Sequence, residues 1–224
     1  MQQRNNTDKK TTIQITQSTR NLMRQFGKKG ATYDEIILKL ITDKLLSEYS
    51  TWLNNQEKVN DESYRKVIVI GDGGVGKTSL IQRYTQGSSN NEYVKTLGAR
   101  FRTHNKRIVF WDLAGQKEFS LMRPTFYNDA KGAIIVFDLS RPETLDSVID
   151  WYEDLKKYCG TLPTILFGNK LDLIANPEKY NKEKVKEIKD KEGFLNFYLT
   201  SAKTGEQVKD AFSSIIKIIV DQSI

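Results

Sequence analysis

The sequence predicts an α/β fold with a mostly parallel central sheet, preceded by a small strand–helix–helix module. Short apolar runs bounded by turn residues alternate with segments of helical spacing, at residues 67–70, 108–111, 133–137, 164–167 and 194–199. Strands that alternate with helices in this way favour a sheet with helices on both faces. A polar stretch without apolar periodicity separates the two parts. We therefore expect a module over residues 1–53, a linker over 54–64 and the α/β domain over 65–224.

The N-terminal module is expected to begin with a strand and a short helix. Ile13 and Ile15 alternate with polar residues over 12–16, which is the period of a strand with one apolar face. A helix then carries Leu22 and Phe26 on one face and ends near residue 27, where a glycine can take the left-handed conformation of a helix end.

A longer helix is expected after residue 31. Thr32 and Glu35 have the spacing of a capping box, in which each side chain accepts from the backbone of the other. The apolar stripe of this helix consists of Ile36, Ile37, Leu40, Ile41 and Leu45. Fewer than about 55 residues rarely bury such side chains alone, so the module is expected to pair with a second copy of the chain.

Two further elements of the α/β domain can be placed by pattern. Residues 99–104 alternate in polarity and face the strand at 107–111 across a tight turn of sequence "NK". This pattern predicts an antiparallel edge strand. The last helix, over 205–220, carries an apolar stripe that we interpret as core packing, made of Val208, Phe212, Ile215, Ile216 and Ile219.

Composition indicates a globular protein, and we expect it in the cytoplasm. It has 224 residues, of which 28% are charged and 38% hydrophobic, and a net charge of +7. The longest apolar run, 133–137, is far too short to span a bilayer, and the polar N-terminus does not resemble a signal peptide. Cys159 has no cysteine partner, and the C-terminus lacks the cysteine of a prenylation motif. We expect no lipid anchor.

A glycine-rich loop carries the first functional signal. Gly71, Gly76, Lys77 and Thr78 satisfy the pattern G-x-x-x-x-G-K-[ST], between a strand and a helix. Glycines let successive N–H groups point at phosphate oxygens, and the helix N-terminus adds partial positive charge. The lysine then supplies an ammonium to the β- and γ-phosphates, and the threonine hydroxyl offers an oxygen to Mg²⁺. The loop predicts a site for a nucleoside triphosphate.

The base is indicated by the segment "NKLD". It follows the strand at 164–167 and contains Asn169, Lys170 and Asp172. A carboxylate at the last position can accept from the ring N1–H and the 2-amino group of guanine, whereas adenine has an acceptor in place of that N1–H. A site built on such hydrogen bonds rejects the wrong base by as much as about 10⁴–10⁵. The expected ligand is therefore GTP or GDP.

These motifs resemble the Ras-superfamily small GTPases, over about 160 residues from Arg65. The resemblance implies the P-loop GTPase fold and Mg²⁺-dependent GTP hydrolysis. "VFWDLAGQ" resembles the element in which Asp112 holds Mg²⁺ through water, the Gly115 N–H meets the γ-phosphate and Gln116 orients the attacking water. "YVKTLG" resembles the first switch, with Thr96 on Mg²⁺ and the γ-phosphate. "TSAKTG" resembles the last guanine loop, with Ala202 on the guanine carbonyl.

The resemblance implies a full set of site residues. Gln116, Lys77 and Thr96 are expected to act in catalysis, and Thr78, Thr96 and Asp112 at the metal. The residues expected to contact GTP are Gly71, Asp72, Gly73, Gly74, Val75, Gly76, Lys77, Thr78, Ser79, Thr96, Gly115, Asn169, Lys170, Asp172, Ser201, Ala202 and Lys203.

Two departures from the family pattern concern the first switch. Ser89 stands where the family usually has an aromatic ring on the guanine, so looser nucleotide binding is expected unless Tyr84 or Tyr93 substitutes. The segment from Thr96 to Asp112 is several residues shorter than usual, which should alter the sheet edge that partners contact. An exchange factor and an activating protein are implied, but the sequence does not identify them.

The N-terminal module resembles the ribbon-helix-helix fold of prokaryotic repressors and antitoxins. In that fold two chains pair their strands, and the ribbon enters the major groove of DNA. The resemblance implies a homodimer through residues 9–53, with Thr12, Gln14 and Thr16 at the bases and Arg4, Lys9 and Lys10 near phosphates. A helical hairpin packed on the GTPase domain of the same chain is the alternative.

Three functions follow from these patterns. The first is a GTP-hydrolysing switch that its N-terminal module dimerises or brings to DNA. The second is a nucleotide-responsive DNA-binding regulator in which hydrolysis is minor. The third is a scaffold without hydrolysis, against which Gln116, Thr96 and the complete "NKLD" argue.

Overall fold

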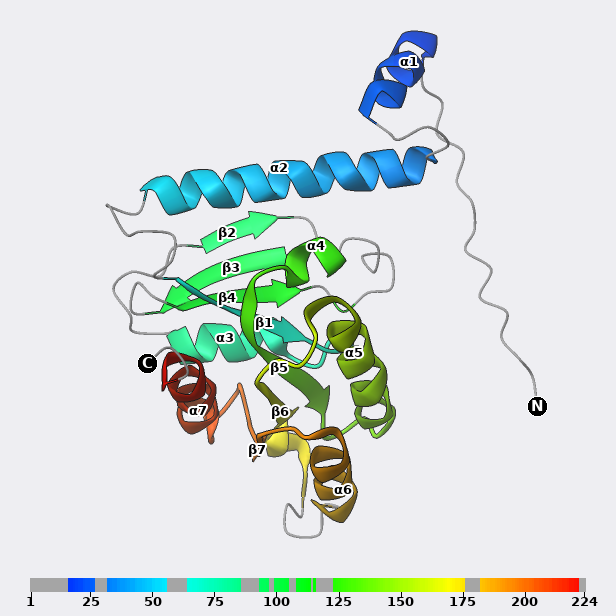
Figure 1. Cartoon of the computed structure of the whole chain (residues 1–224). Helices are drawn as coiled ribbons and strands as arrows, with labels where there is room; N and C mark the ends of the chain where they lie inside the picture. The colour runs from blue at the N-terminus through cyan, green and yellow to red at the C-terminus, as the bar shows by residue number, and fades with distance from the viewer. Residues whose placement is uncertain are drawn as a thin grey trace, which may run out of the picture.

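The computed structural model describes residues 16–26, 32–55, 64–85, 93–96, 99–104, 108–113, 115, 123–175 and 182–221. Its centre is a seven-stranded sheet with the strand order β2-β3-β4-β1-β5-β6-β7 (Figure 1). The strands are β1 (Arg65–Ile70), β2 (Tyr93–Thr96), β3 (Ala99–His104), β4 (Ile108–Leu113), β5 (Ala130–Asp138), β6 (Thr164–Asn169) and β7 (Asn196–Leu199). The helices are α1 (Gln17–Phe26), α2 (Tyr33–Asn55), α3 (Lys77–Thr85), α4 (Arg123–Tyr127), α5 (Glu143–Cys159), α6 (Lys182–Glu192) and α7 (Val208–Asp221), with a short 3₁₀ turn, η3 (Leu171–Leu173).

The mostly parallel sheet predicted from sequence is confirmed. Strands β4, β1, β5, β6 and β7 pair in parallel, and β3 pairs with β4 in antiparallel register, from Ala99 opposite Leu113 to His104 opposite Ile108. The prediction that residues 99–104 form the edge is wrong, because β2 pairs with β3 on its outer side. Four residues, Tyr93–Thr96, were too short a run for the pattern to detect.

Both faces of the sheet are buried, as parallel strands require. Along β1, Ile68 and Ile70 belong to the apolar cluster under α4, α5 and α6, whereas Val67 and Val69 belong to the cluster under α3 and α7. The predicted stripe of the last helix is confirmed as core, since α7 buries Val208, Phe212, Ile215 and Ile219 and packs Ile216 against the same cluster. The carboxyl ends of β1, β5 and β6 therefore open on one rim of the sheet, where ligands of such folds bind.

The two helices of the N-terminal module are confirmed, and so is the capping box. The backbone N–H of Thr32 donates to the Glu35 carboxylate at 2.7 Å, and the Glu35 N–H donates to the Thr32 hydroxyl at 3.2 Å. Helix α2 continues to Asn55, two residues into the predicted linker. Figure 1 shows it as one long helix on the β2 side of the sheet.

Of the predicted strand at 12–16, the structure describes only the last residue, Thr16. Thr16 caps α1, because its hydroxyl accepts the Thr19 N–H at 3.1 Å, so the prediction that Thr16 is a strand residue is wrong. Residues 1–15, with Arg4, Lys9, Lys10, Thr12 and Gln14, lie outside the described residues.

Helix α2 contacts the α/β domain of its own chain. Ile41 and Leu46 pack against the apolar cluster that contains Trp111, Leu113 and Phe126. Ile36 and Thr42 are buried, while Ile37, on the predicted stripe, is 38% exposed. One of the two helices of the alternative hairpin, α2, thus packs on its own domain. Among the described residues, the helices lack a segment of the length and apolarity needed to cross a bilayer.

The aromatic centre of the α3/α7 face gives a test of the core. The Phe212 ring lies 5.1 Å from that of Phe110, 5.3 Å from that of Phe167 and 4.5 Å from that of Tyr84, centroid to centroid. We expect Phe212→Ala to lower the free energy of unfolding by about 3–5 kcal/mol, measured by denaturant titration. Val220→Ala, at an exposed position of the same helix, should change it by less than about 0.5 kcal/mol. Similar losses in the two variants would contradict this account of the core.

Candidate functional site

The loop between β1 and α3 can be built only with glycine at two of its positions. Gly71 and Gly76 have φ of 134° and 99°, in the region that side chains disfavour. A Cβ on Gly71 would collide with the Val136 carbonyl oxygen, and one on Gly76 with the Asn169 amide. The loop is thus pressed between β5 and β6 at the rim of the sheet.

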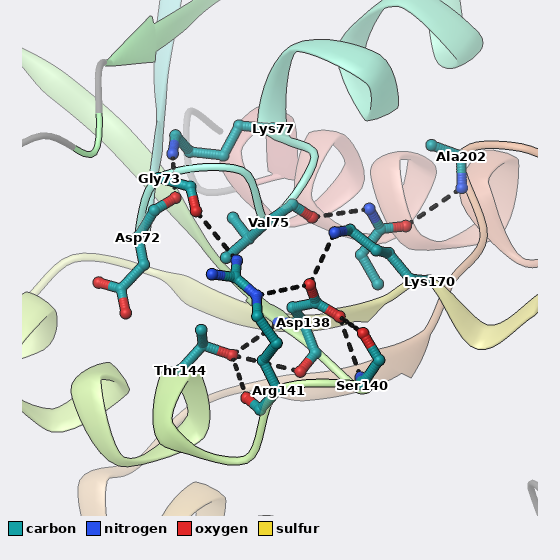
Figure 2. Close-up of polar contacts among 11 residues, drawn as sticks. Asp72, Gly73, Val75, Lys77, Asp138, Ser140, Arg141, Thr144, Lys170 and Ala202 are labelled. Carbon is teal, nitrogen blue, oxygen red and sulfur yellow. Dashed lines mark hydrogen bonds and ion pairs between the residues drawn. The ribbon is translucent and has the colours of Figure 1, made fainter. Parts of the chain in front are cut away.

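Lys77 begins α3 and turns back over this loop. Its ammonium donates to the Asp72 carbonyl oxygen at 2.8 Å (Figure 2). It also donates to the Gly71 carbonyl oxygen at 2.8 Å, and the residue is only 7% exposed. Burial lowers the pKa of Lys77 to about 8, although the nearby carboxylates of Asp112 and Asp72 act in the opposite direction. A desolvated cation at a helix N-terminus, bonded to neutral carbonyls, is a favourable place for phosphate oxygens.

Thr78 and Asp112 bring two oxygen-bearing side chains together beside Lys77. The Thr78 hydroxyl donates to the Asp112 carboxylate, although the residues are 34 positions apart. A hydroxyl and a carboxylate in contact fit Mg²⁺, which takes oxygen ligands and commonly uses few protein carboxylates together with substrate phosphates. The described part of the chain contains no group of three or more His, Cys, Asp or Glu that could hold a metal without such help.

The segment after β4 contacts the loop between β1 and α3, residues 71–76, which we call the phosphate loop. A Cβ on Gly115 would collide with the carbonyl groups of Gly71 and Asp72, so the Gly115 backbone lies directly on the loop. Thr96 ends β2 opposite Ala99, and the description of Thr96 is limited to its backbone. Gln116 and Ser89 lie outside the described residues.

Asn169 joins three loops at the end of β6. Its buried amide donates to the Val75 carbonyl at 2.8 Å, and its oxygen accepts the Ala202 N–H at 3.1 Å (Figure 2). Asp172 and the last loop are also tied together, because the Ser201 hydroxyl donates to the Asp172 carboxylate at 2.6 Å and the Lys203 ammonium lies 3.8 Å from it. The sequence-predicted guanine residues therefore meet at one place, next to the phosphate loop.

Asp138, at the end of β5, is a site residue that the sequence analysis did not identify. Its carboxylate accepts from the Lys170 ammonium at 2.7 Å, from Arg141 Nε at 2.9 Å and from the Ser140 hydroxyl at 2.6 Å (Figure 2). Burial alone would raise the pKa of Asp138, but the hydrogen bonds from Lys170, Ser140 and Arg141 outweigh it and lower the pKa to about 2. The sequence feature that could have identified Asp138 is its position at the carboxyl end of a predicted parallel strand, where ligands of such sheets bind.

Trp151 of α5 is a second residue without a sequence signal. Its indole N–H donates to the Asp72 carboxylate at 2.7 Å, which ties the phosphate loop to the helix. The Arg123 guanidinium of α4 lies 4.0 Å from the centre of the Trp151 ring. The loop is thus held from α5 as well as from β5 and β6.

The lowered pKa of Asp138 predicts a pH dependence. A carboxyl whose pKa falls from 3.8 to about 2 on folding stabilises the protein above about pH 4, and this contribution disappears as the pH falls through 2. We expect Asp138→Asn to lower the free energy of unfolding by roughly 2 kcal/mol at pH 7, with a difference that shrinks between pH 4 and pH 2. Urea titrations of both proteins over this pH range measure it.

Asp190→Asn provides the matched control. The pKa of Asp190 is also lowered, chiefly by its hydrogen bond with Lys189, but the carboxylate is exposed on α6. Its substitution should leave the pH dependence of unfolding unchanged. A wild-type-to-Asp138→Asn difference of the same size at pH 3 and pH 7 would contradict the role assigned to the ionised carboxylate.

Comparison with known proteins agrees with this geometry. Residues 66–221 match the model of the Ras family. Ras-related protein Rab-13 of Bos taurus is 33% identical over 166 residues, covering 70% of this chain and 81% of that protein. Ras-related protein RABA5d of Arabidopsis thaliana is 34% identical over 175 residues (75% and 79%), and Ras-related protein Rab-27B of Homo sapiens 32% over 176 (69% and 79%). The chain belongs to the Ras family and is a small GTPase, which binds and hydrolyses GTP.

Proposed function

We propose that the chain is a slow GTP-hydrolysing switch in which the rim of the sheet reads the γ-phosphate. The observation that carries the proposal is the convergence of the Lys77 ammonium, the Thr78–Asp112 pair and the Gly115 backbone on one loop. Guanine is recognised next to them by Asp172, supported by Ser201 and Lys203. Base and phosphates are thus read by loops in direct contact.

In this proposal the chain's own groups stabilise charge and orient water. Lys77 and the loop N–H groups bind the β- and γ-phosphates, and Thr78, Asp112 and Thr96 hold Mg²⁺. Bound Mg²⁺ supplies neutralisation of the charge on the phosphate oxygens. Gln116 positions the water for attack in line with the leaving group.

The switch action follows from where the γ-phosphate contacts sit. Gly115 follows β4 and Thr96 is the last residue of β2, so both belong to segments beside the antiparallel part of the sheet. Loss of the γ-phosphate removes both contacts and lets the two segments relax, which changes the surface there. Hydrolysis without a partner is expected to be slow, and an arginine supplied by an activating protein would accelerate it by about 10³–10⁵.

Turnover of GTP tests the proposed roles. We expect the purified protein to release bound GDP on denaturation and to hydrolyse GTP slowly with Mg²⁺, and Gln116→Leu to lower this rate by about tenfold or more, because the water loses its orienting group. Gln82→Leu, at an exposed glutamine of α3, is the control and should keep the wild-type rate. Equal rates in wild type and Gln116→Leu would refute the role of Gln116, whereas bound adenine nucleotide would refute the base assignment.

For the N-terminal module we propose a role within its own chain. Helix α2 covers apolar side chains of the α/β domain through Ile41 and Leu46, on the β2 side of the sheet (Figure 1). A partner that recognises this side of the sheet must then fit around α2 or displace it. Homodimerisation through residues 9–53 and DNA binding are the alternative, in which the same stripe is shared with a second copy.

A pair of isoleucines distinguishes these roles. Under the proposal Ile41→Ala lowers the free energy of unfolding by about 1–2 kcal/mol, because a packed side chain is shortened, while Ile37→Ala, at an exposed position, has little effect. Sedimentation should show a monomer in all three proteins, with GDP or a GTP analogue. A wild-type dimer that Ile37→Ala dissociates would support the alternative instead.

A further inference from the structure

Arg141 occupies a position between the two halves of the nucleotide site. It lies in the turn from β5 to α5, where its Nε donates to the Asp138 carboxylate and its Nη2 donates to the Gly73 carbonyl, both at 2.9 Å (Figure 2). The sequence separation from Gly73 is 68 residues, so this bond joins two loops that are distant in the chain. Neither the sequence motifs nor the proposed catalytic steps use Arg141.

The backbone that carries Arg141 is fixed. The Thr144 hydroxyl donates to the Arg141 carbonyl at 2.7 Å, and the Arg141 N–H donates to the Asp138 carbonyl at 2.9 Å. The Asp138 N–H in turn donates to the Thr144 hydroxyl oxygen at 2.9 Å. The guanidinium therefore starts from a rigid turn rather than from a loose loop.

The Asp138 carboxylate divides its oxygens between two tasks. Oδ1 accepts from the backbone N–H and the hydroxyl of Ser140, which hold the carboxylate in place. Oδ2 accepts both the Lys170 ammonium and Arg141 Nε. One buried oxygen thus connects the lysine of the guanine motif with the arginine that reaches the phosphate loop.

The bond to the Gly73 carbonyl sets the direction of the next peptide group. In a planar trans peptide the C=O and the following N–H point in opposite directions. Because the Gly73 carbonyl points to Arg141, the Gly74 N–H points to the other side, as is required of a loop N–H that binds a phosphate oxygen. Gly73 and Gly74 are exposed, and Gly74 has φ of 74°, so this turn of the loop otherwise has wide conformational freedom.

We propose that Arg141 is a positioning residue for the nucleotide: with Asp138 it clamps the Gly73–Gly74 turn to Lys170, so that the phosphate and guanine sites keep one geometry. The clamp rests on the proposed binding of a guanine nucleotide at this rim. An arginine suits the task because its planar fork holds two acceptors at once, which a lysine ammonium does with less directional control.

Nucleotide retention tests the clamp. The dissociation rate of a fluorescent GDP analogue, with Mg²⁺ present, is compared among wild type, Arg141→Ala, Arg141→Lys and Asp146→Asn. We expect Arg141→Ala to release the analogue about tenfold faster or more, because a charge-assisted hydrogen bond to the loop is lost, and Arg141→Lys to be intermediate. Asp146→Asn breaks the exposed ion pair between Asp146 of α5 and Lys184 of α6, and this variant should release the analogue at the wild-type rate.

A second measurement separates positioning from general loss of structure. Competition experiments give the affinities for GDP and GMP, and GMP lacks the β-phosphate that the loop binds. Under the proposal Arg141→Ala lowers the GDP affinity about tenfold more than the GMP affinity. An equal loss for both ligands would assign Arg141 a structural role and overturn the clamp.

The outcomes also separate this inference from the proposed function. Wild-type retention of GDP together with a wild-type dissociation rate in Arg141→Ala would overturn the clamp and leave the switch intact. A wild type that fails to retain any guanine nucleotide would overturn the base and phosphate assignments, and the clamp with them.

Discussion

The site depends on one buried amide. Asn169 donates to the phosphate loop at Val75 and accepts from the last loop at Ala202, so three segments that meet only in the folded chain share one side chain. The amide suits this place because it carries both donors and an acceptor, whereas a carboxylate has only acceptors. Asn169 is 1% exposed, so losing either hydrogen bond would leave a buried polar group unpaired, at a cost of about 1–3 kcal/mol in stability. Position 76 requires glycine, because a Cβ there would collide with the Asn169 amide.

The charges around the nucleotide site are distributed unequally. Lys170 and Arg141 share the Asp138 carboxylate, and Lys203 lies near Asp172, so these three cations are partly neutralised by their neighbours. Lys77 instead donates to two carbonyl oxygens and is the most deeply buried of the four, which is why its pKa falls to about 8. Folding has already removed water from the Lys77 ammonium, and a bound anion would offset the cost of that desolvation. The phosphates are therefore favoured there more than at the outer cations.

The sequence was most informative where backbone geometry limits the residue type. The glycines of the phosphate loop, the Thr32–Glu35 capping box and the apolar runs of the parallel strands each have a local cause, and each was predicted from a few neighbouring letters. Asp138, Arg141 and Trp151 were missed because their roles arise only when β5 and α5 come beside the phosphate loop. Strand β2 was missed as the sheet edge because four residues of β-structure depend on the pairing with β3 rather than on their own pattern. Thr16 has the alternation of a strand, but a threonine before a helix is also a good N-cap, and that local bond decided its place.

Helix α2 shows how the two parts of the chain constrain each other. It has 23 residues and apolar side chains on more than one face, so part of its surface must be covered by other elements. One set of side chains, Ile41 and Leu46, meets the cluster of Trp111 and Leu113 on the α/β domain. Trp111 and Leu113 alternate with Asp112, whose carboxylate meets Thr78 beside the phosphate loop. Because Trp111, Asp112 and Leu113 are consecutive in β4, a shift of this strand that moves Asp112 also moves two members of the apolar cluster that α2 packs against. The apolar cluster that α2 contacts and the Thr78–Asp112 hydrogen bond therefore share one strand, β4.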